Sequence, residues 1–342
     1  MEVEGLRCHE MGICSRRRQG RAWGGIRKCD GTKVADTETD KVGLTVVFDY
    51  SGTLSLDAVA FARSDILVEE LRRSGLAEFS IAAPETFWDR LVNPTWEEGS
   101  RGPIGYRHLL TREISAAWSA EKKITALPAL DRAASAFVAR YLQCSRIDPS
   151  WHPLLRALYD HPRVVVVVAT DHYAEATAAI VGHLRILGME AVPLGASDAV
   201  DPRQAIIVAN SADIGFHKDE EEFWRRIRES GGGAGLRERI RGPLSLPCPG
   251  GMPGPVVLVD DFGGNEASDD QYGRRDKVAA RQRRTAALLA KVFTGPVEIY
   301  PFLPSGGAAP EEGARRLIDE IAARIADRMA ALTTPPANDQ SL

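Results

Sequence analysis

An apolar run that stops at an aspartate and then turns at a glycine is the feature that most constrains this chain. Residues 44–48 are almost entirely apolar, Asp49 follows them directly, and Gly52 and Thr53 come soon after. Such a run is typical of a buried parallel strand, whose end lies at the sheet edge where open α/β folds bind ligands. We expect the turn at Gly52 and Thr53 to present backbone N–H groups to an anion. Asp49 can then serve as a covalent phosphoryl acceptor, provided that a cation and hydrogen-bond donors offset its repulsion from the phosphate.

The composition is that of an ordinary globular protein, and it narrows the class of partner. The chain has 342 residues, 44% hydrophobic and 26% charged, a length that suggests about two domains. Its net charge of -4 argues against a nucleic-acid binder, because such proteins neutralise phosphates with an excess of Lys and Arg. Five scattered cysteines without CxxC spacing predict neither a disulfide framework nor a zinc site. We find no membrane span or secretory signal, and expect a cytoplasmic protein whose partner is a small phosphorylated metabolite.

Apolar periodicity predicts a doubly wound, Rossmann-like α/β core with a helical cap inserted after its first strand. Buried strands are predicted at 44–48, 164–169, 191–194, 205–209, 255–259 and 297–302. Core helices are predicted at 153–159, 174–187, 220–228, 277–292 and 311–332, and cap helices at 58–74, 83–91, 105–118 and 129–142. The core therefore comprises 43–56 and 151–332, and the cap 57–150. We expect a disordered polar extension at 1–42, a surface loop at 230–255 and a flexible tail at 333–342.

Further polar residues end predicted strands or precede a predicted helix. They are Thr170 after the second strand, Lys218 before the helix at 220–228, and Asp260, Asp261 and Asn265 after the strand at 255–259. Because the carboxyl ends of parallel strands meet at one sheet edge, we expect these residues to share a crevice with Asp49. A hydroxyl can hydrogen-bond a phosphate oxygen, an ammonium can balance negative charge, and paired carboxylates are the hard oxygen ligands that Mg²⁺ prefers.

In order and residue type, these positions resemble the four motifs of the haloacid dehalogenase superfamily of hydrolases. The resemblance covers roughly residues 44–302 and includes the helical insertion between the first and second motifs. It implies that Thr170 and Lys218 bind the phosphoryl group. It also implies that Asn265 supports Lys218 or a metal-bound water.

The resemblance further implies a magnesium-dependent hydrolase of phosphate monoesters. Asp49 would attack phosphorus and form an aspartyl-phosphate. Asp49, the backbone carbonyl of Ser51 and Asp261 would hold Mg²⁺. Asp260 would be a further ligand or would orient the metal.

Ser51 departs from the pattern that the resemblance implies. Phosphatases of this superfamily have a second aspartate two residues after the nucleophile, where it protonates the leaving group, and a serine cannot do this near neutral pH. General acid–base catalysis contributes about 10²–10⁴-fold. Three interpretations stay open: His172 or His108 replaces the acid; the phosphorylated Asp49 is long-lived or its leaving group needs no proton; or the chain is a pseudo-hydrolase that binds a ligand or a protein.

The stretch 93–101 in the predicted cap is the candidate for substrate selectivity. It combines Trp96, Glu97 and Arg101, and we interpret it as a loop that closes over the substrate. A solvated loop with one buried tryptophan fits the same residues equally well. His217, beside Lys218, lies where it could titrate near the crevice.

Overall fold

The computed structural model describes residues 43–116, 118–199, 204–230, 254–266, 275–304 and 310–333. All of them belong to one compact unit, 38–342. The predictions for the extension at 1–42, for nearly all of the loop at 230–255 and for the tail at 333–342 lie outside the described residues. No helix within the described ranges has the length and apolar character needed to cross a membrane.

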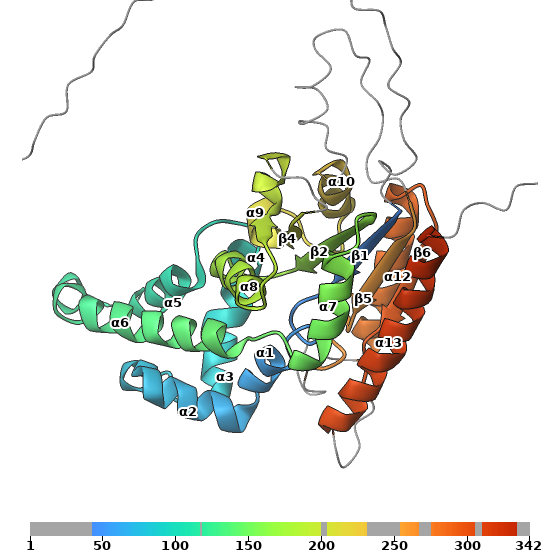
Figure 1. Cartoon of the computed structure of the whole chain (residues 1–342). Helices are drawn as coiled ribbons and strands as arrows, with labels where there is room; N and C mark the ends of the chain where they lie inside the picture. Colours follow the sequence, from blue (N-terminus) through green and yellow to red (C-terminus); the bar gives the residue numbers. More distant parts are fainter. Residues whose placement is uncertain are drawn as a thin grey trace, which may run out of the picture. The chain divides into compact units, whose positions relative to one another are not determined.

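Six parallel strands form one sheet in the order β3-β4-β2-β1-β5-β6 (Figure 1). They are β1 (Leu44–Phe48), β2 (Val164–Thr170), β3 (Ala191–Pro193), β4 (Ile206–Asn210), β5 (Val256–Asp260) and β6 (Val297–Pro301), each within a residue of the predicted run. The chain leaves β1 toward β2 on one side and later adds β5 on the other. The topological switch point therefore lies beside β1, where open sheets bind ligands.

Helices cover both faces of the sheet, as the predicted α/β class requires. One face is covered by α7 (His152–Tyr159), α8 (Glu175–Ile186) and α13 (Pro310–Thr333), and the other by α10 (Glu221–Ser230) and α12 (Arg275–Val292). Successive side chains of a strand point to opposite faces, so Val46 and Phe48 pack in the first layer and Val47 in the second. Burial on both faces explains why these strands are near-continuous apolar runs.

The chain between β1 and β2 forms a group of helices with a hydrophobic core of its own, drawn blue to green in Figure 1. Its elements are α1 (Leu56–Phe61), α2 (Ser64–Ser74), the 3-10 helix η2 (Leu76–Phe79), α3 (Pro84–Phe87), the π-helix η3 (Trp88–Val92), α4 (Asn93–Gly99), α5 (Tyr106–Ser115) and α6 (Ala120–Cys144). We call residues 56–144 the helical segment. Its described residues contain no strand, as predicted. Shorter elements elsewhere are the 3-10 turns η4 (Pro149–Trp151) and η5 (Leu194–Ala199) and the helix α9 (Ser211–Ile214).

Element boundaries in the helical segment differ from the prediction. The helix predicted at 58–74 is α1 and α2, because Arg63 between them adopts an extended backbone with ψ of 138°. The helix predicted at 129–142 starts at Ala120, since Ser119 caps it by accepting a hydrogen bond from the N–H of Lys122. The prediction of a loop at 93–101 is wrong. Most of it is α4, whose proline stands in the first turn, where a missing N–H is tolerated.

Candidate functional site

A cavity of about 560 Å³ lies between the carboxyl ends of the strands and the helical segment. Asp49, Thr170, Asp260 and Asp261 line it from the strand ends, and Lys218 lines it from the loop before α10. The structure therefore brings these five predicted residues to one place. The volume falls in the range of roughly 300–1,000 Å³ that small-molecule sites occupy.

The ammonium of Lys218 lies between two carboxylates at one end of the cavity. Its Nζ is 2.6 Å from Oδ1 of Asp49 and 2.9 Å from Oδ2 of Asp260, whose side chains are 6% and 3% exposed. The backbone of Lys218 is held on both sides. Its N–H donates to Oδ1 of Asp171 at 3.0 Å, and its carbonyl accepts from Nε1 of Trp224 in α10 at 2.6 Å. These contacts fix the loop so that Lys218 points at the ends of β1 and β5.

Asp261 is held by the turn that follows β5. Its Oδ1 accepts the N–H of Gly263 at 2.9 Å, and its Oδ2 accepts the N–H of Asn265 at 3.0 Å. The N–H of Asp261 donates to Oγ1 of Thr53 at 3.0 Å. Thr53 therefore joins the turn after β1 to the turn after β5, and does so through its side chain.

Gly52 is required by the close approach of these two turns. Its φ is +81°, and a Cβ placed on it would lie 2.4 Å from Oδ2 of Asp261. The side chain of Asn265 tightens the same contact, because its Nδ2 donates to the carbonyl of Gly52 at 2.6 Å and to that of Phe302 at 3.0 Å. The structure thus places the amide of Asn265 on backbone carbonyls and not on Lys218, the first of the two partners that the resemblance implies. The second, a metal-bound water, stays a prediction.

The N–H groups of Gly52 and Thr53 do not face an anion site, so that prediction is wrong. Gly52 donates to the carbonyl of Ser55 at 2.9 Å, and Thr53 donates to the carbonyl of Tyr50 at 3.4 Å. A tight turn uses its own donors to close itself. These two residues shape the turn and are not among those that line the cavity.

Burial dominates the electrostatics of the carboxylates. It raises the pKa of Asp49 well above the ordinary value, and Asp260 and Asp261 raise this pKa further, whereas Lys218 lowers it. Burial, followed by the charge of Asp260, raises the pKa of Asp261 to about 7. Burial also raises the pKa of Asp171. The contact with Lys218 therefore does not offset the cost of charging these groups.

The donor atoms at this end of the cavity suit a hard divalent cation. Carboxylate oxygens of Asp49, Asp260 and Asp261 lie within 4.8 Å of one another, and all three residues are buried. The raised pKa values of Asp49 and Asp261 indicate that added positive charge would stabilise their ionised forms. An all-oxygen set of ligands is what Mg²⁺ prefers.

Ser51 belongs to a chain of polar groups that ends at His172. Tyr141 of α6 lies beside Ser51, and its Oη lies 2.7 Å from Nε2 of His172. Nδ1 of His172 accepts the N–H of Tyr173 at 2.8 Å, so Nε2 carries the ring proton and donates it to Tyr141. Burial lowers the pKa of His172 to about 4, which keeps the ring neutral near pH 7. His108, the other histidine proposed as an acid, is exposed on α5 and does not line the cavity.

The three residues proposed for selectivity separate in the structure. Trp96 lines the cavity. Glu97 and Arg101 are outside its lining and pair with each other at 2.6 Å, while Arg101 also contacts Glu220 at 2.7 Å. This pairing ties the end of α4 to the loop that carries Lys218.

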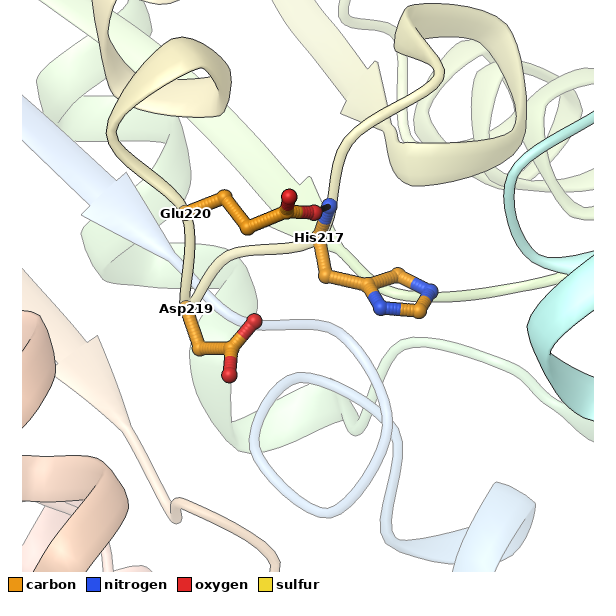
Figure 2. A group of neighbouring side chains, drawn as sticks. All are labelled: His217, Asp219 and Glu220. Atoms are coloured by element: carbon orange, nitrogen blue, oxygen red, sulfur yellow. Dashed lines mark hydrogen bonds between the residues drawn. The ribbon is translucent and has the colours of Figure 1, made fainter.

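The loop before α10 carries a second group of side chains that could bind a metal ion, namely His217, Asp219 and Glu220 (Figure 2). Its ligand atoms already have partners. Nε2 of His217 is 2.7 Å from Oγ of Ser100, and Oε2 of Glu220 accepts the N–H of His217 at 2.9 Å. Arg284 pairs with Asp219 at 3.3 Å. We interpret these three residues as contacts that position the loop.

Two residues of the site were not singled out from the sequence. Asp171 directly follows Thr170, so the rule that located Thr170 at a strand end also applies to it. Tyr141 lies within a long amphipathic helix, where a tyrosine toward the cavity has the same spacing as one in the core. No local signal distinguishes the two cases.

Comparisons with models of protein families, with curated proteins and with solved structures gave no match for this chain.

Gly52→Ala should destabilise the protein, because the new Cβ would meet the Asp261 carboxylate and the residue would keep a positive φ. We expect a loss of about 2 kcal/mol or more in the free energy of unfolding, measured by urea titration. Gly182→Ala in α8 is the matched control, since a Cβ there has no neighbour within 4 Å. It should be neutral or stabilise by up to about 1 kcal/mol. Equal effects of the two substitutions would contradict the close approach of the turns.

The stability difference between Asp261→Asn and the wild type should depend on pH when no metal is added. A carboxyl whose pKa is raised in the folded state holds its proton more tightly there, so its contribution to stability is lost as pH rises from its ordinary pKa toward about 7. Asn does not titrate. The free energy of unfolding of the variant should therefore rise, relative to that of the wild type, by about 1 kcal/mol per pH unit between pH 5 and 7.

Urea unfolding in a chelating buffer at pH 5, 6 and 7 measures this difference. His172 has a lowered pKa and therefore stabilises the fold as pH rises, which is opposite to the effect of Asp261. This contribution is present in both proteins and cancels in the stability difference between them. A difference that stays constant over this range would mean that Asp261 ionises as an ordinary exposed aspartate.

Proposed function

We propose that this protein is a magnesium-dependent phosphohydrolase that acts on a small phosphate monoester through an aspartyl-phosphate at Asp49. The contact that carries the proposal is that of Lys218 with both Asp49 and Asp260 at the charged end of the cavity. An ammonium in this position can bind the incoming phosphate and reduce its repulsion from the carboxylate. The order of the motifs, which resembles that of the haloacid dehalogenase superfamily, gives independent support.

The chemistry proceeds in two displacements. In the first, an oxygen of Asp49 bonds to phosphorus while the bond from phosphorus to the ester oxygen breaks, and the leaving oxygen takes the electron pair and then a proton. In the second, water attacks phosphorus, the bond from phosphorus to Asp49 breaks, and phosphate leaves. The hydroxyl of Thr170, which lines the cavity at the end of β2, would hydrogen-bond a phosphate oxygen.

Asp49, Asp260 and Asp261 would hold the magnesium ion, together with the Ser51 carbonyl. When bound, the ion supplies positive charge that keeps Asp49 ionised and offsets the charge of the phosphate. Burial alone favours the protonated form of Asp49, which is not a nucleophile. We therefore expect activity to require the metal.

The helical segment acts in this proposal as a cap that excludes water and selects the leaving group. It is inserted between β1 and β2 and forms the wall of the cavity opposite the strand ends. Trp96 is the residue of the 93–101 stretch with a role in selectivity, because it lines the cavity. The proposed partner is a small phosphorylated metabolite in the cytoplasm.

Ser51 supports a second candidate, a pseudo-hydrolase that binds a ligand or a protein through the same cavity. No carboxylate stands at this position, and the neutral imidazole of His172 reaches Ser51 only through Tyr141. A neutral imidazole is a weak proton donor. Binding without turnover is the behaviour that this candidate predicts.

Asp49→Asn tests the proposal. Acetyl phosphate is a suitable substrate, because it is small and its leaving group needs no acid. We expect the variant to lose at least about a thousandfold in kcat/KM, since the amide is not a nucleophile. Beryllium fluoride with Mg²⁺ should raise the Tm of the wild type and leave that of the variant unchanged.

Asp160→Asn is the matched control, since Asp160 is an exposed aspartate after α7 that does not line the cavity. It should behave as the wild type in both assays. Turnover that persists in Asp49→Asn would refute the covalent mechanism. A beryllium fluoride shift in the wild type without turnover of any phosphate ester would favour the pseudo-hydrolase.

A further inference from the structure

The cavity has a charged end and an aromatic end. Nine of the twenty-eight residues that line it are Phe, Trp or Tyr, whereas these types make up 7% of the chain. Those from the helical segment include Phe61, Phe87, Trp96, Tyr106, Phe137 and Tyr141. They line the same cavity as the charged groups at the strand ends. A phosphate bound near Lys218 would therefore direct its ester group toward aromatic side chains.

The aromatic end offers few partners to a polar leaving group. Among the described residues that line the cavity, those from the helical segment include no charged side chain, and their polar groups are the amide of Asn93 and the hydroxyl or indole groups of aromatic residues. Burying a hydroxyl without a hydrogen-bond partner is costly. A sugar or other polyol phosphate would place several hydroxyls in this position. The composition of the wall therefore disfavours that class of substrate.

The aromatic rings are held in place by contacts with one another. Tyr106 stacks on Tyr173 with ring centroids 4.0 Å apart, and the edge of Trp96 meets Tyr173 at 5.4 Å. Phe61 meets Tyr141 edge-on at 5.3 Å. Rings in such arrangements present faces and edges to which a planar aromatic group packs with little loss of side-chain entropy. A flexible aliphatic chain gains none of this directional contact.

The lack of an acidic side chain at Ser51 also favours the ester of an aromatic alcohol. A phenol ionises with a pKa of about 10, as tyrosine does. An aliphatic alcohol is far less acidic, closer to water at about 15.7. An aryl oxygen can therefore leave with its electron pair as a phenolate and take a proton from water afterwards. An alkoxide needs a proton as the bond breaks, and Ser51 does not supply one.

We infer that the substrate is the phosphate ester of an aromatic alcohol, with the phosphate at Asp49 and Lys218 and the ring against the aromatic side chains of the helical segment that line the cavity. The inference rests on the proposed function and names the substrate class of the same site. Attack by Asp49 breaks the bond between phosphorus and the aryl oxygen. The phenol then leaves, and water releases phosphate from Asp49.

Four esters test the inference on the wild-type protein with Mg²⁺. Phenyl and 2-naphthyl phosphate have similar leaving groups but differ in ring area, and we expect kcat/KM to be about tenfold higher for the naphthyl ester. Cyclohexylmethyl phosphate and glucose 6-phosphate are both primary alkyl esters and differ in polarity. Both should be at least about a hundredfold slower than phenyl phosphate. A preference for the sugar ester, or equal rates for all four, would overturn the inference.

Trp96→Leu separates recognition of the ring from the chemistry. The substitution should lower the ratio of kcat/KM for 2-naphthyl phosphate to that for acetyl phosphate by about tenfold. Trp118→Leu is the matched control, because Trp118 belongs to the same part of the chain and is not among the residues that line the cavity. It should leave the ratio unchanged. An unchanged ratio in Trp96→Leu would remove Trp96 from the ring site and count against the inference.

Ser51→Asp tests the argument from the leaving group. An added acid should raise the ratio of the rate for cyclohexylmethyl phosphate to that for phenyl phosphate at least about tenfold. The ratio of the two rates within one variant does not depend on how much of the protein is folded. No gain for the alkyl ester would mean that another group already donates the proton, and the preference for aryl esters would lose its chemical basis.

Acetyl phosphate distinguishes failure of this inference from failure of the proposed function. Turnover of acetyl phosphate that depends on Asp49, together with no preference for aryl esters, would overturn the inference and leave the phosphohydrolase proposal standing. Absence of turnover for acetyl phosphate and for all four esters would overturn both.

Discussion

The structure of the site depends on the placement of three buried carboxylates around one ammonium. Asp49, Asp260 and Asp261 carry like charges in a region from which water is largely removed, and such an arrangement is costly unless it is compensated. Lys218 supplies part of the compensation, and backbone N–H groups of the turn after β5 supply another part. The loop before α10 holds that ammonium in place through the backbone contacts of Lys218. The remaining imbalance would favour the binding of a cation by this cluster.

The sheet and the charged end of the cavity could be predicted because one physical rule determines both. A parallel strand covered on two faces must be apolar over its whole length, so its end is marked by the first polar residue. That residue lies at the edge where ligands bind. Asp49, Thr170 and Asp260 follow this rule. Lys218 and Asp261 could be predicted at the same edge, because short connections return the chain to it.

The aromatic wall and the details of the turns could not be predicted, because contacts distant in sequence decide them. The start of α6 depends on a cap at Ser119, and the path through α3, η3 and α4 includes a π-helical turn that apolar spacing does not reveal. Asn265 was assigned a partner from its place in a motif, but its amide reaches across to the turn after β1. The role of Gly52 is also tertiary, since its neighbour, Asp261, lies far along the chain.

The two walls of the cavity come from separate stretches of chain, which has a consequence for how selectivity can change. The charged groups are anchored in the sheet and its loops, while most of the aromatic surface belongs to one continuous insertion whose helices pack into a separate hydrophobic cluster. Substitutions within that cluster that lie far from Lys218 can reshape the aromatic wall with little effect on the ionic contacts, because distant sites that share no partners act nearly independently. Such a division lets one wall of the cavity vary in shape while the other keeps its charges.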